Sequence, residues 1–97
     1  MAAIIKSGTF DAWLGNLRDR VGRARILVRI DRLAAGNPGD HKSVGGGLSE
    51  LRISFGPGYR VYYMTKGPLL IVLVAGGDKS TQAADIAKAK AIAQEWE

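Results

Sequence analysis

Apolar residues near the start of the chain recur at the spacing of one helix face. The recurring positions are Phe10, Trp13, Leu14, Leu17 and Val21. This stripe predicts a helix that is interrupted near Gly22 and that Ser7 or Thr9 can cap with a hydroxyl. A second helical stripe comprises Ile26, Leu27, Ile30, Leu33 and Ala34. Gly36 and Pro38 end that pattern, so the two helices are expected to form a hairpin.

After residue 47 the apolar period changes from that of a helix to that of a strand. Residues 48–55 alternate between apolar and polar, and residues 59–65 are rich in β-branched and aromatic side chains. Residues 69–75 are apolar on both faces, which places this strand in the centre of a sheet. Residues 2–5 predict a short edge strand, and residues 37–47, which end in three glycines, predict a loop. A last helix, capped by Ser80 or Thr81, is expected to follow.

These elements predict an α+β fold for a single domain over residues 1–97. An N-terminal helix hairpin packs on a small antiparallel sheet with a mixed edge, and a C-terminal helix follows. Short connections favour antiparallel pairing among the last three strands. The helices are expected to cover one sheet face and to leave the other face open. The longest apolar run has seven residues, which is far too short to cross a bilayer, so we expect a cytoplasmic protein without membrane contact.

Composition narrows the chemistry. The chain has no cysteine and one histidine, His41, which excludes a disulfide scaffold, a thiol nucleophile and sulfur-based zinc sites. No metal or other cofactor is therefore expected. Fourteen Lys and Arg against nine Asp and Glu leave a net charge of +5, which suits an anionic partner such as nucleic acid or an acidic protein.

Four cations are candidates for a shared anion site. Strand alternation places Arg52 and Arg60 on the same face of the predicted sheet, opposite their apolar neighbours. Lys79 lies just beyond the third strand of the meander, and Lys42 in the glycine-rich loop can join the group. Guanidinium groups match the oxygens of phosphate in pairs, so a phosphate is the expected ligand.

Each of these residues also has a plain structural explanation, and both explanations stay open. A single arginine on a two-faced strand is commonly just solvated. Tyr62 can share the open face with Arg60 and stack on a nucleic-acid base, or it can simply pack in the sheet. A basic stripe on the second helix is either a solvated surface or a partner-binding edge, and it comprises Arg25, Arg29 and Arg32. His41 stands in a predicted loop, where an exposed histidine commonly has no special role.

Several blocks of this sequence resemble the RelE/ParE toxin superfamily, most closely its HigB-like branch of addiction-module killer proteins. The blocks are LSELRI at residues 48–53, GPGYRVYY at 56–63 and GGDKSTQ at 76–82. Phe10, Trp13 and Leu14, together with GNPGD at residues 36–40, also fit that branch, so the resemblance covers essentially the whole chain. It implies a RelE-like fold and the toxin of a type II toxin–antitoxin system.

The resemblance implies a ribosome-dependent, metal-free endoribonuclease that cuts mRNA in the ribosomal A site and so inhibits translation. The partners would be the ribosome, mRNA and a cognate antitoxin, typically a helix-turn-helix protein of the HigA type. Operator DNA would be bound only through the toxin–antitoxin complex. The ParE-like members of the superfamily poison DNA gyrase instead, and a basic binding module without catalytic activity is a third possibility.

The resemblance also assigns roles to individual residues. Arg60 corresponds to the arginine after the "GY" turn, which stabilises charge in the transition state, and Arg52 stands where relatives carry a catalytic lysine. Lys79 falls where the family places a further cation. The tyrosine that some relatives carry in the last helix has no counterpart at residues 84–86, which leaves His41 and Lys79 as candidates for proton transfer.

Overall fold

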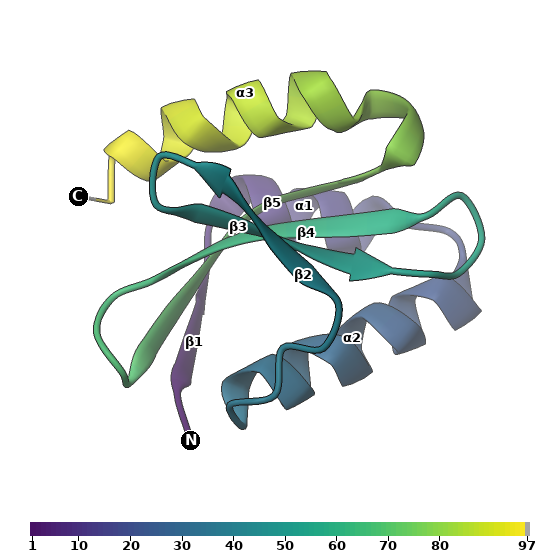
Figure 1. Cartoon of the computed structure of the whole chain (residues 1–97). Coiled ribbons are helices and arrows are strands. Elements are labelled where there is room, and N and C mark those ends of the chain that lie inside the picture. Colours follow the sequence, from purple (N-terminus) through teal and green to yellow (C-terminus); the bar gives the residue numbers. More distant parts are fainter. Residues whose placement is uncertain (97) are drawn as a thin grey trace.

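The computed structural model describes residues 1–96, which form a five-stranded sheet with helices on both faces (Figure 1). The elements in chain order are β1 (Ala3–Lys6), α1 (Gly8–Asn16), α2 (Arg20–Ala34), β2 (His41–Gly45), β3 (Leu48–Ile53), β4 (Tyr59–Thr65), β5 (Leu70–Asp78), the 3₁₀ turn η1 (Lys79–Thr81) and α3 (Gln82–Gln94). The predicted α+β class, with two N-terminal helices and one C-terminal helix, is confirmed, and the topology is consistent with a RelE-like fold. Among the described residues, no helix has the length and apolarity that a bilayer crossing requires.

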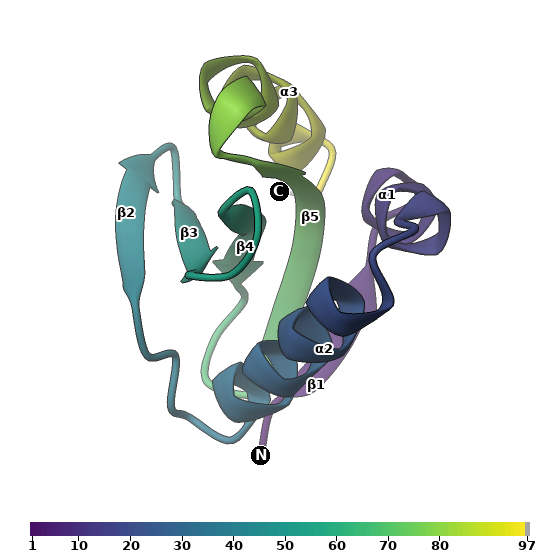
Figure 2. The ribbon, with the colours of Figure 1, turned by 90° about the vertical axis from the view of Figure 1, so that its right-hand side faces the viewer.

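The strands are ordered β1-β5-β4-β3-β2 across the sheet. β1 pairs with β5 in parallel, and all other neighbours are antiparallel, so the expected mixed edge is present. β5 has a partner on each side, which confirms the central position that its continuous apolar run predicted. Figure 2 shows the strands from β2 to β5 with α2 on one side and α3 on the other.

The sequence pattern did not predict the edge strand β2. Residues 37–47 were expected to be a loop, but His41–Gly45 form the edge strand β2 beside β3. This strand is held by backbone hydrogen bonds, and its side chains are mostly exposed, so it carries no apolar alternation that could reveal it. Gly45, Gly46 and Gly47 all have positive φ angles, of 88°, 64° and 78°, and form the turn that returns the chain into β3.

The first helical stripe is divided between two helices. α1 is capped by Ser7, whose hydroxyl accepts a hydrogen bond from the N–H of Phe10 at 3.0 Å, and it ends at Asn16. Asp19 then caps α2 by accepting from the N–H of Gly22 at 2.9 Å. Val21 therefore belongs to α2, where 56% of it is exposed, and the prediction that it continues the apolar stripe of the first helix is wrong.

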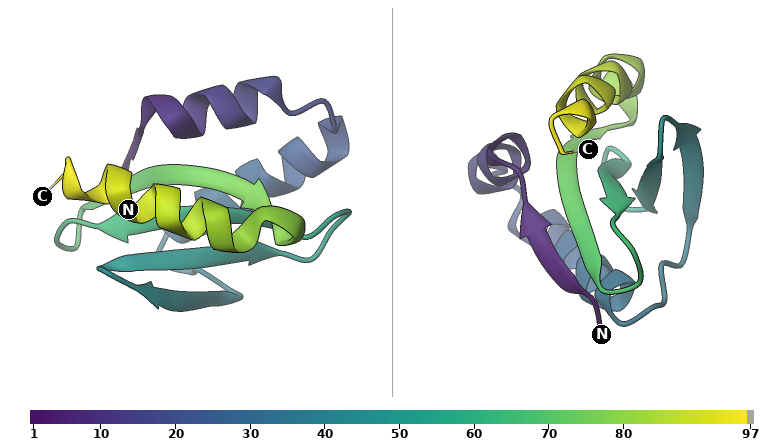
Figure 3. Two further views of the ribbon diagram at one scale, coloured as in Figure 1. Left: turned by 90° about the horizontal axis from the view of Figure 1, so that it is seen from above. Right: turned by 90° about the vertical axis from the view of Figure 1, so that its left-hand side faces the viewer.

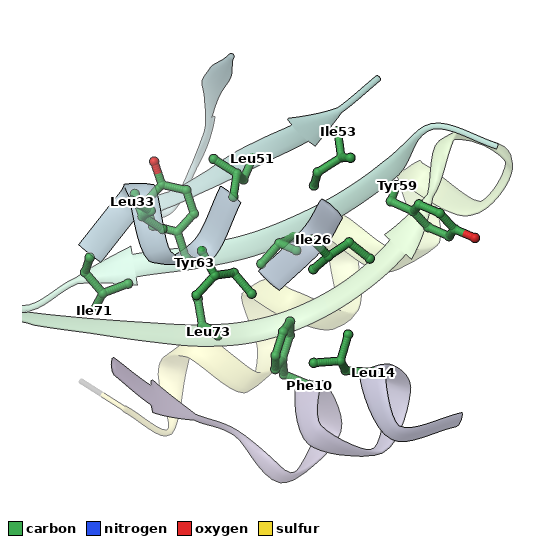
Figure 4. Packing of buried hydrophobic residues seen from close by; sticks show 12 residues of the cluster. Phe10, Leu14, Ile26, Leu33, Leu51, Ile53, Tyr59, Tyr63, Ile71 and Leu73 are labelled. Carbon is green, nitrogen blue, oxygen red and sulfur yellow. The ribbon is translucent and has the colours of Figure 1, made fainter. Parts of the chain in front are cut away.

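Both faces of the sheet are covered, but to different extents. The face below α1 and α2 is packed with apolar side chains from both helices and three strands (Figure 4). On the other face, Ala89 and Ala93 of α3 pack over Tyr62, Val72 and Val74. The expectation that this face is open is therefore wrong for β4 and β5, whereas β2 and β3 extend beyond α3 (Figure 3). The boundary of α3 on this face is where the charged residues gather.

Candidate functional site

The pairing of β3 with β4 brings two of the predicted site residues together. Arg52 and Arg60 are direct cross-strand partners, and both side chains lie on the face that α3 partly covers. The side chain of Arg52 is 32% exposed and that of Arg60 is 13% exposed, so the two cations stand at the border between the packed and the open part of this face. Neither is a freely solvated surface arginine.

A buried carboxylate lies beneath the two arginines. Glu50 is fully buried, and its Oε1 accepts a hydrogen bond from Arg52 Nε at 3.1 Å. The Nε of Arg60 is 3.7 Å from the same oxygen. Sequence reasoning placed Glu50 on the solvent side of its strand and gave it no role, because alternation reports which face a residue occupies and not what covers that face.

Tyr62 belongs to this buried cluster and is not a free stacking platform. The residue is fully buried, and its hydroxyl donates to Glu50 Oε2 at 3.1 Å. Burial raises the pKa of the Tyr62 hydroxyl above its ordinary value, and the negative charge of Glu50 raises it further. Of the two alternatives left open for Tyr62, base stacking and packing in the sheet, the structure has Tyr62 packed in the sheet under α3.

Lys79 lies beside Arg60 at Gly58, in the turn between β3 and β4. A Cβ atom placed on Gly58 would lie 3.4 Å from Lys79 Cβ and 3.7 Å from Arg60 Nη1, so both side chains flank this residue. Gly58 has a φ of 81° in the turn between β3 and β4, a conformation that favours glycine. The turn thus holds the first residue of η1 close to the second residue of β4, as strand order predicted.

The two candidates from β2 point to opposite faces. Lys42 pairs with Glu50 and so shares the face of the arginine pair, whereas His41 pairs with Leu51, whose side chain is in the core under α2. His41 is exposed, and its Nδ1 lies 2.8 Å from the carbonyl oxygen of Gly39. The structure therefore places His41 on the opposite face of the sheet from the arginine pair, and its suggested part in proton transfer stays a prediction.

The basic stripe of α2 is only partly free. Arg29 donates to the backbone carbonyls of Arg52, Pro38 and Asp40, and so ties α2 to β3 and to the start of β2. The guanidinium of Arg25 stacks 4.5 Å above the ring of Phe55. These arginines border an open groove of about 550 Å³ between α2 and the end of β3.

That groove combines an apolar surface with a basic rim. Val21 and Val28 are 56% and 48% exposed along it, and Ile53 and Phe55 line its other side. The cations at the rim are Arg25, Arg29 and Arg32. No acidic side chain from the described residues lines the groove, so its electrostatic preference is for an anionic partner.

The arginine site suits electrostatic stabilisation of an anion. An arginine stays protonated at all physiological pH values, so it cannot act as an acid or a base. Two guanidinium groups and an ammonium group supply several N–H donors for phosphate oxygens. Within residues 1–96, no group of three or more His, Cys, Asp or Glu side chains is placed to hold a metal ion.

Comparison with known proteins gives two matches. The profile of the family described as phage derived protein Gp49-like (DUF891) matches residues 12–97. A protein of Haemophilus influenzae strain Rd, described as an uncharacterized protein, is 53% identical over 87 residues, which span 90% of this chain and 88% of that protein. The region that the family profile matches includes β2 to β5 and α3, and thus every residue of the arginine site.

Proposed function

This chain belongs to the Gp49-like phage-derived family, a HigB-like toxin family that includes mRNA interferases, and from that premise we propose that it is a toxin that cleaves mRNA on the ribosome. The observation that carries the proposal is the cross-strand pair of Arg52 and Arg60 with Lys79 beside it. A phosphodiester bound there would meet positive charge from two strands and from the start of η1.

In the proposed reaction, the ribose 2′ hydroxyl gives its proton to a solvent water and its oxygen attacks the adjacent phosphorus. The bond from phosphorus to the 5′ oxygen of the next nucleotide breaks, which leaves a 2′,3′-cyclic phosphate. Negative charge builds up on the phosphoryl oxygens in the transition state, and the guanidinium groups of Arg60 and Arg52 stabilise it. Preorganised donors of this kind contribute about 10²–10³-fold each to the rate. We assign Lys79 to donate a proton to the departing 5′ oxygen, since its ammonium group carries protons that the arginines do not release.

The partner proposed for the groove beside α2 is the cognate antitoxin, a helix-turn-helix protein of the HigA type. An acidic amphipathic segment would place apolar side chains on Val21 and Val28 and carboxylates against the arginine rim. Operator DNA would be reached only through the complex, and the proposed site of action is the ribosome in the cytoplasm.

Expression in cells that lack the antitoxin tests the nuclease proposal. We expect induction of the chain to stop growth and to produce new 5′ ends within translated messages. Arg60→Ala is expected to abolish both effects, while Arg18→Ala, which removes an exposed arginine between α1 and α2, leaves them unchanged. Growth arrest with intact messages and broken DNA would indicate a gyrase poison, and a harmless wild-type chain would indicate a binding module.

Salt titration of the toxin–antitoxin affinity tests the groove. Attraction between the arginine rim and an acidic segment weakens as salt screens it, so affinity is expected to fall steeply with ionic strength. The double variant Arg25→Ala and Arg32→Ala should flatten that dependence. A control that removes two cations outside the groove, Arg18→Ala with Lys88→Ala, should not. An affinity that barely responds to salt contradicts the assignment of the groove.

A further inference from the structure

Glu50 is an unusual residue for the centre of a sheet face, because it is an ionisable side chain without exposed surface. Apart from the tyrosines, the only polar or charged residues that are buried within the described part of the chain are Glu50 and Ser7. Burying a carboxylate costs several kcal/mol unless hydrogen bonds and opposite charges compensate it. Three donors that hydrogen-bond to Glu50, together with the positive charge of Arg60 at 3.7 Å, supply that compensation, so its position reflects a specific arrangement of its neighbours.

The carboxylate separates two like charges. Arg52 and Arg60 lie directly opposite each other on adjacent strands, where two cations repel. Oε1 of Glu50 accepts from Arg52 Nε at 3.1 Å and lies 3.7 Å from Arg60 Nε, so one oxygen attracts both side chains. Arg60 Nε is buried and makes no hydrogen bond, which leaves this ion pair as its compensation.

Contact through Nε fixes the direction of each guanidinium group. One terminal nitrogen of Arg60, Nη1, lies 3.3 and 3.4 Å from the carbonyl oxygens of Tyr59 and Gly58. These are long contacts that a phosphate oxygen can replace with shorter, charge-assisted bonds.

The second oxygen of Glu50 connects the site to α3. Oε2 accepts from Tyr62 at 3.1 Å and from Nε2 of Gln82, the first residue of α3, at 2.7 Å. Together these bonds fix the plane of the carboxylate. Because Glu50 is fully buried, a ribose hydroxyl cannot reach either oxygen to transfer a proton to it.

We propose that Glu50 is the positioning residue of this site, holding Arg52 and Arg60 at the spacing that lets both contact one phosphate. This inference rests on the function proposed above and deepens it. Glu50 acts through the arginines and does not touch RNA. The negative charge of Glu50 opposes RNA binding. Removing that charge should therefore not weaken RNA affinity, although it should lower the cleavage rate.

The first test is Glu50→Gln in cleavage of mRNA on programmed ribosomes. The site loses a negative charge, so RNA and ribosome affinity should stay the same or increase, while the cleavage rate falls about 100-fold because the guanidinium groups lose their alignment. The pH profile should keep its shape. The matched control is Asp40→Asn, whose exposed carboxylate is 3.9 Å from Arg52 Nη1, and it should change the rate by less than about twofold.

Two outcomes of this test overturn the proposal. Loss of one limb of the pH profile in Glu50→Gln would identify Glu50 as a general base, which touches the reacting atoms. An unchanged rate would show that the arginines are aligned without it.

The second test does not depend on cleavage. In ¹⁵N spectra of the wild-type toxin, the Nε–H signals of Arg52 and Arg60 should exchange with water more slowly than that of the exposed Arg18, and inorganic phosphate should shift both together. If Glu50→Gln fails to fold, Gln82→Ala takes its place. This variant keeps the carboxylate and removes its bond to α3, so it should speed the exchange of both signals. Fast exchange in the wild type, or two unrelated phosphate responses, overturns the proposal. A wild-type chain that shows these signals but cuts no RNA refutes the nuclease and supports the positioning role.

Discussion

The two faces of the sheet differ in the kinds of side chain that they bury. On the face under α1 and α2, twelve buried residues form one cluster in which Tyr59 and Tyr63 carry the polar side-chain atoms (Figure 4). On the face under α3, a smaller apolar cluster ends beside the charged group of Glu50, Arg52 and Arg60. One face therefore stabilises the fold mainly by apolar area, while the other combines an apolar part with a buried ionic part.

The covering helices explain this difference. α2 is long and presents Ile26, Ile30 and Leu33, so it excludes water from β3 and β4. α3 contributes Ala89 and Ala93, whose small side chains allow a close approach to β5 but reach little further. The polar residues at the edge of α3 thus keep partial access to solvent, which a site for a charged ligand requires. Substitutions on the two faces should therefore differ in their effects: those on the α2 face should lower stability, and those at the charged cluster should lower activity.

The largest effect on stability is expected on the α2 face. Ile26 is fully buried, so Ile26→Ala should lower the free energy of unfolding by about 2–5 kcal/mol, through lost apolar burial and a residual cavity. Leu27 is its neighbour on the same helix and is 40% exposed, so Leu27→Ala should cost clearly less. Urea denaturation of both variants measures this difference, and equal losses would contradict the assignment of the core.

On the α3 face, activity should be lost without a comparable loss of stability. Arg60→Lys keeps the charge but removes the planar fork, so we expect cleavage to slow by about 100-fold, which corresponds to roughly 2.7 kcal/mol of transition-state stabilisation. The free energy of unfolding should change by less than about 1 kcal/mol, since the ammonium group still faces Glu50. Ribosome-programmed cleavage and urea denaturation on the same sample check both parts.

Two adjacent glycines of β5 allow a direct comparison of the faces. A Cβ on Gly76 would lie 2.1 Å from the ring of Trp13, which is wedged between α1 and the sheet, so Gly76→Ala should cost about 1–3 kcal/mol. A Cβ on Gly77 would lie 1.9 Å from Asp85 Oδ2, the end of a side chain that can turn away. Gly77→Ala should therefore cost less, mainly through loss of the bond from Thr81 to Asp85. Thermal melts of the two variants rank the costs, and the reverse order would contradict this account.

The smallest change in the free energy of unfolding is expected at Tyr59, at alkaline pH. Burial, together with the hydrogen bond that its hydroxyl donates to Asp19, raises the pKa of Tyr59 to about 12. Since the unfolded state loses this proton near pH 10, the stabilisation is complete below that pH and declines as the pH rises toward 12. Tyr59→Phe should remove the part of the decline that belongs to this residue. Urea midpoints between pH 8 and 12 measure it, and parallel curves would refute the assignment.

The elements that the sequence predicts well are those whose side-chain pattern alone decides their position. Alternation placed Tyr59, Val61 and Tyr63 toward the α2 core and Arg60 on the other face, and the structure agrees. The chain of α1 and α2 was predicted as a hairpin, but the break at Asp19 was missed, although an Asp three residues before Gly22 is an ordinary capping signal.

The site itself depends on neighbours that are distant in sequence, and for that reason only half of it could be predicted. The cation pair follows from local alternation and a tight turn. The burial of Glu50 and Tyr62 depends on α3, whose Gln82 lies 32 residues beyond Glu50, and no local pattern contains that contact. The strand β2 is held by backbone bonds, which the identity of exposed side chains does not encode.

The parallel pairing of β1 with β5 has a consequence for the synthesis of this protein. The strand made first hydrogen-bonds only to a strand that begins at Leu70, and Ser7 fastens the junction by donating to the carbonyl of Val74. Contacts of such long sequence separation form slowly and late. A nascent chain with two thirds of its length translated still lacks residues 70–73, the partner of its first strand, and it also lacks Lys79. The cations of the proposed site, Arg60 and Lys79, therefore come together only after most of the chain has been synthesised.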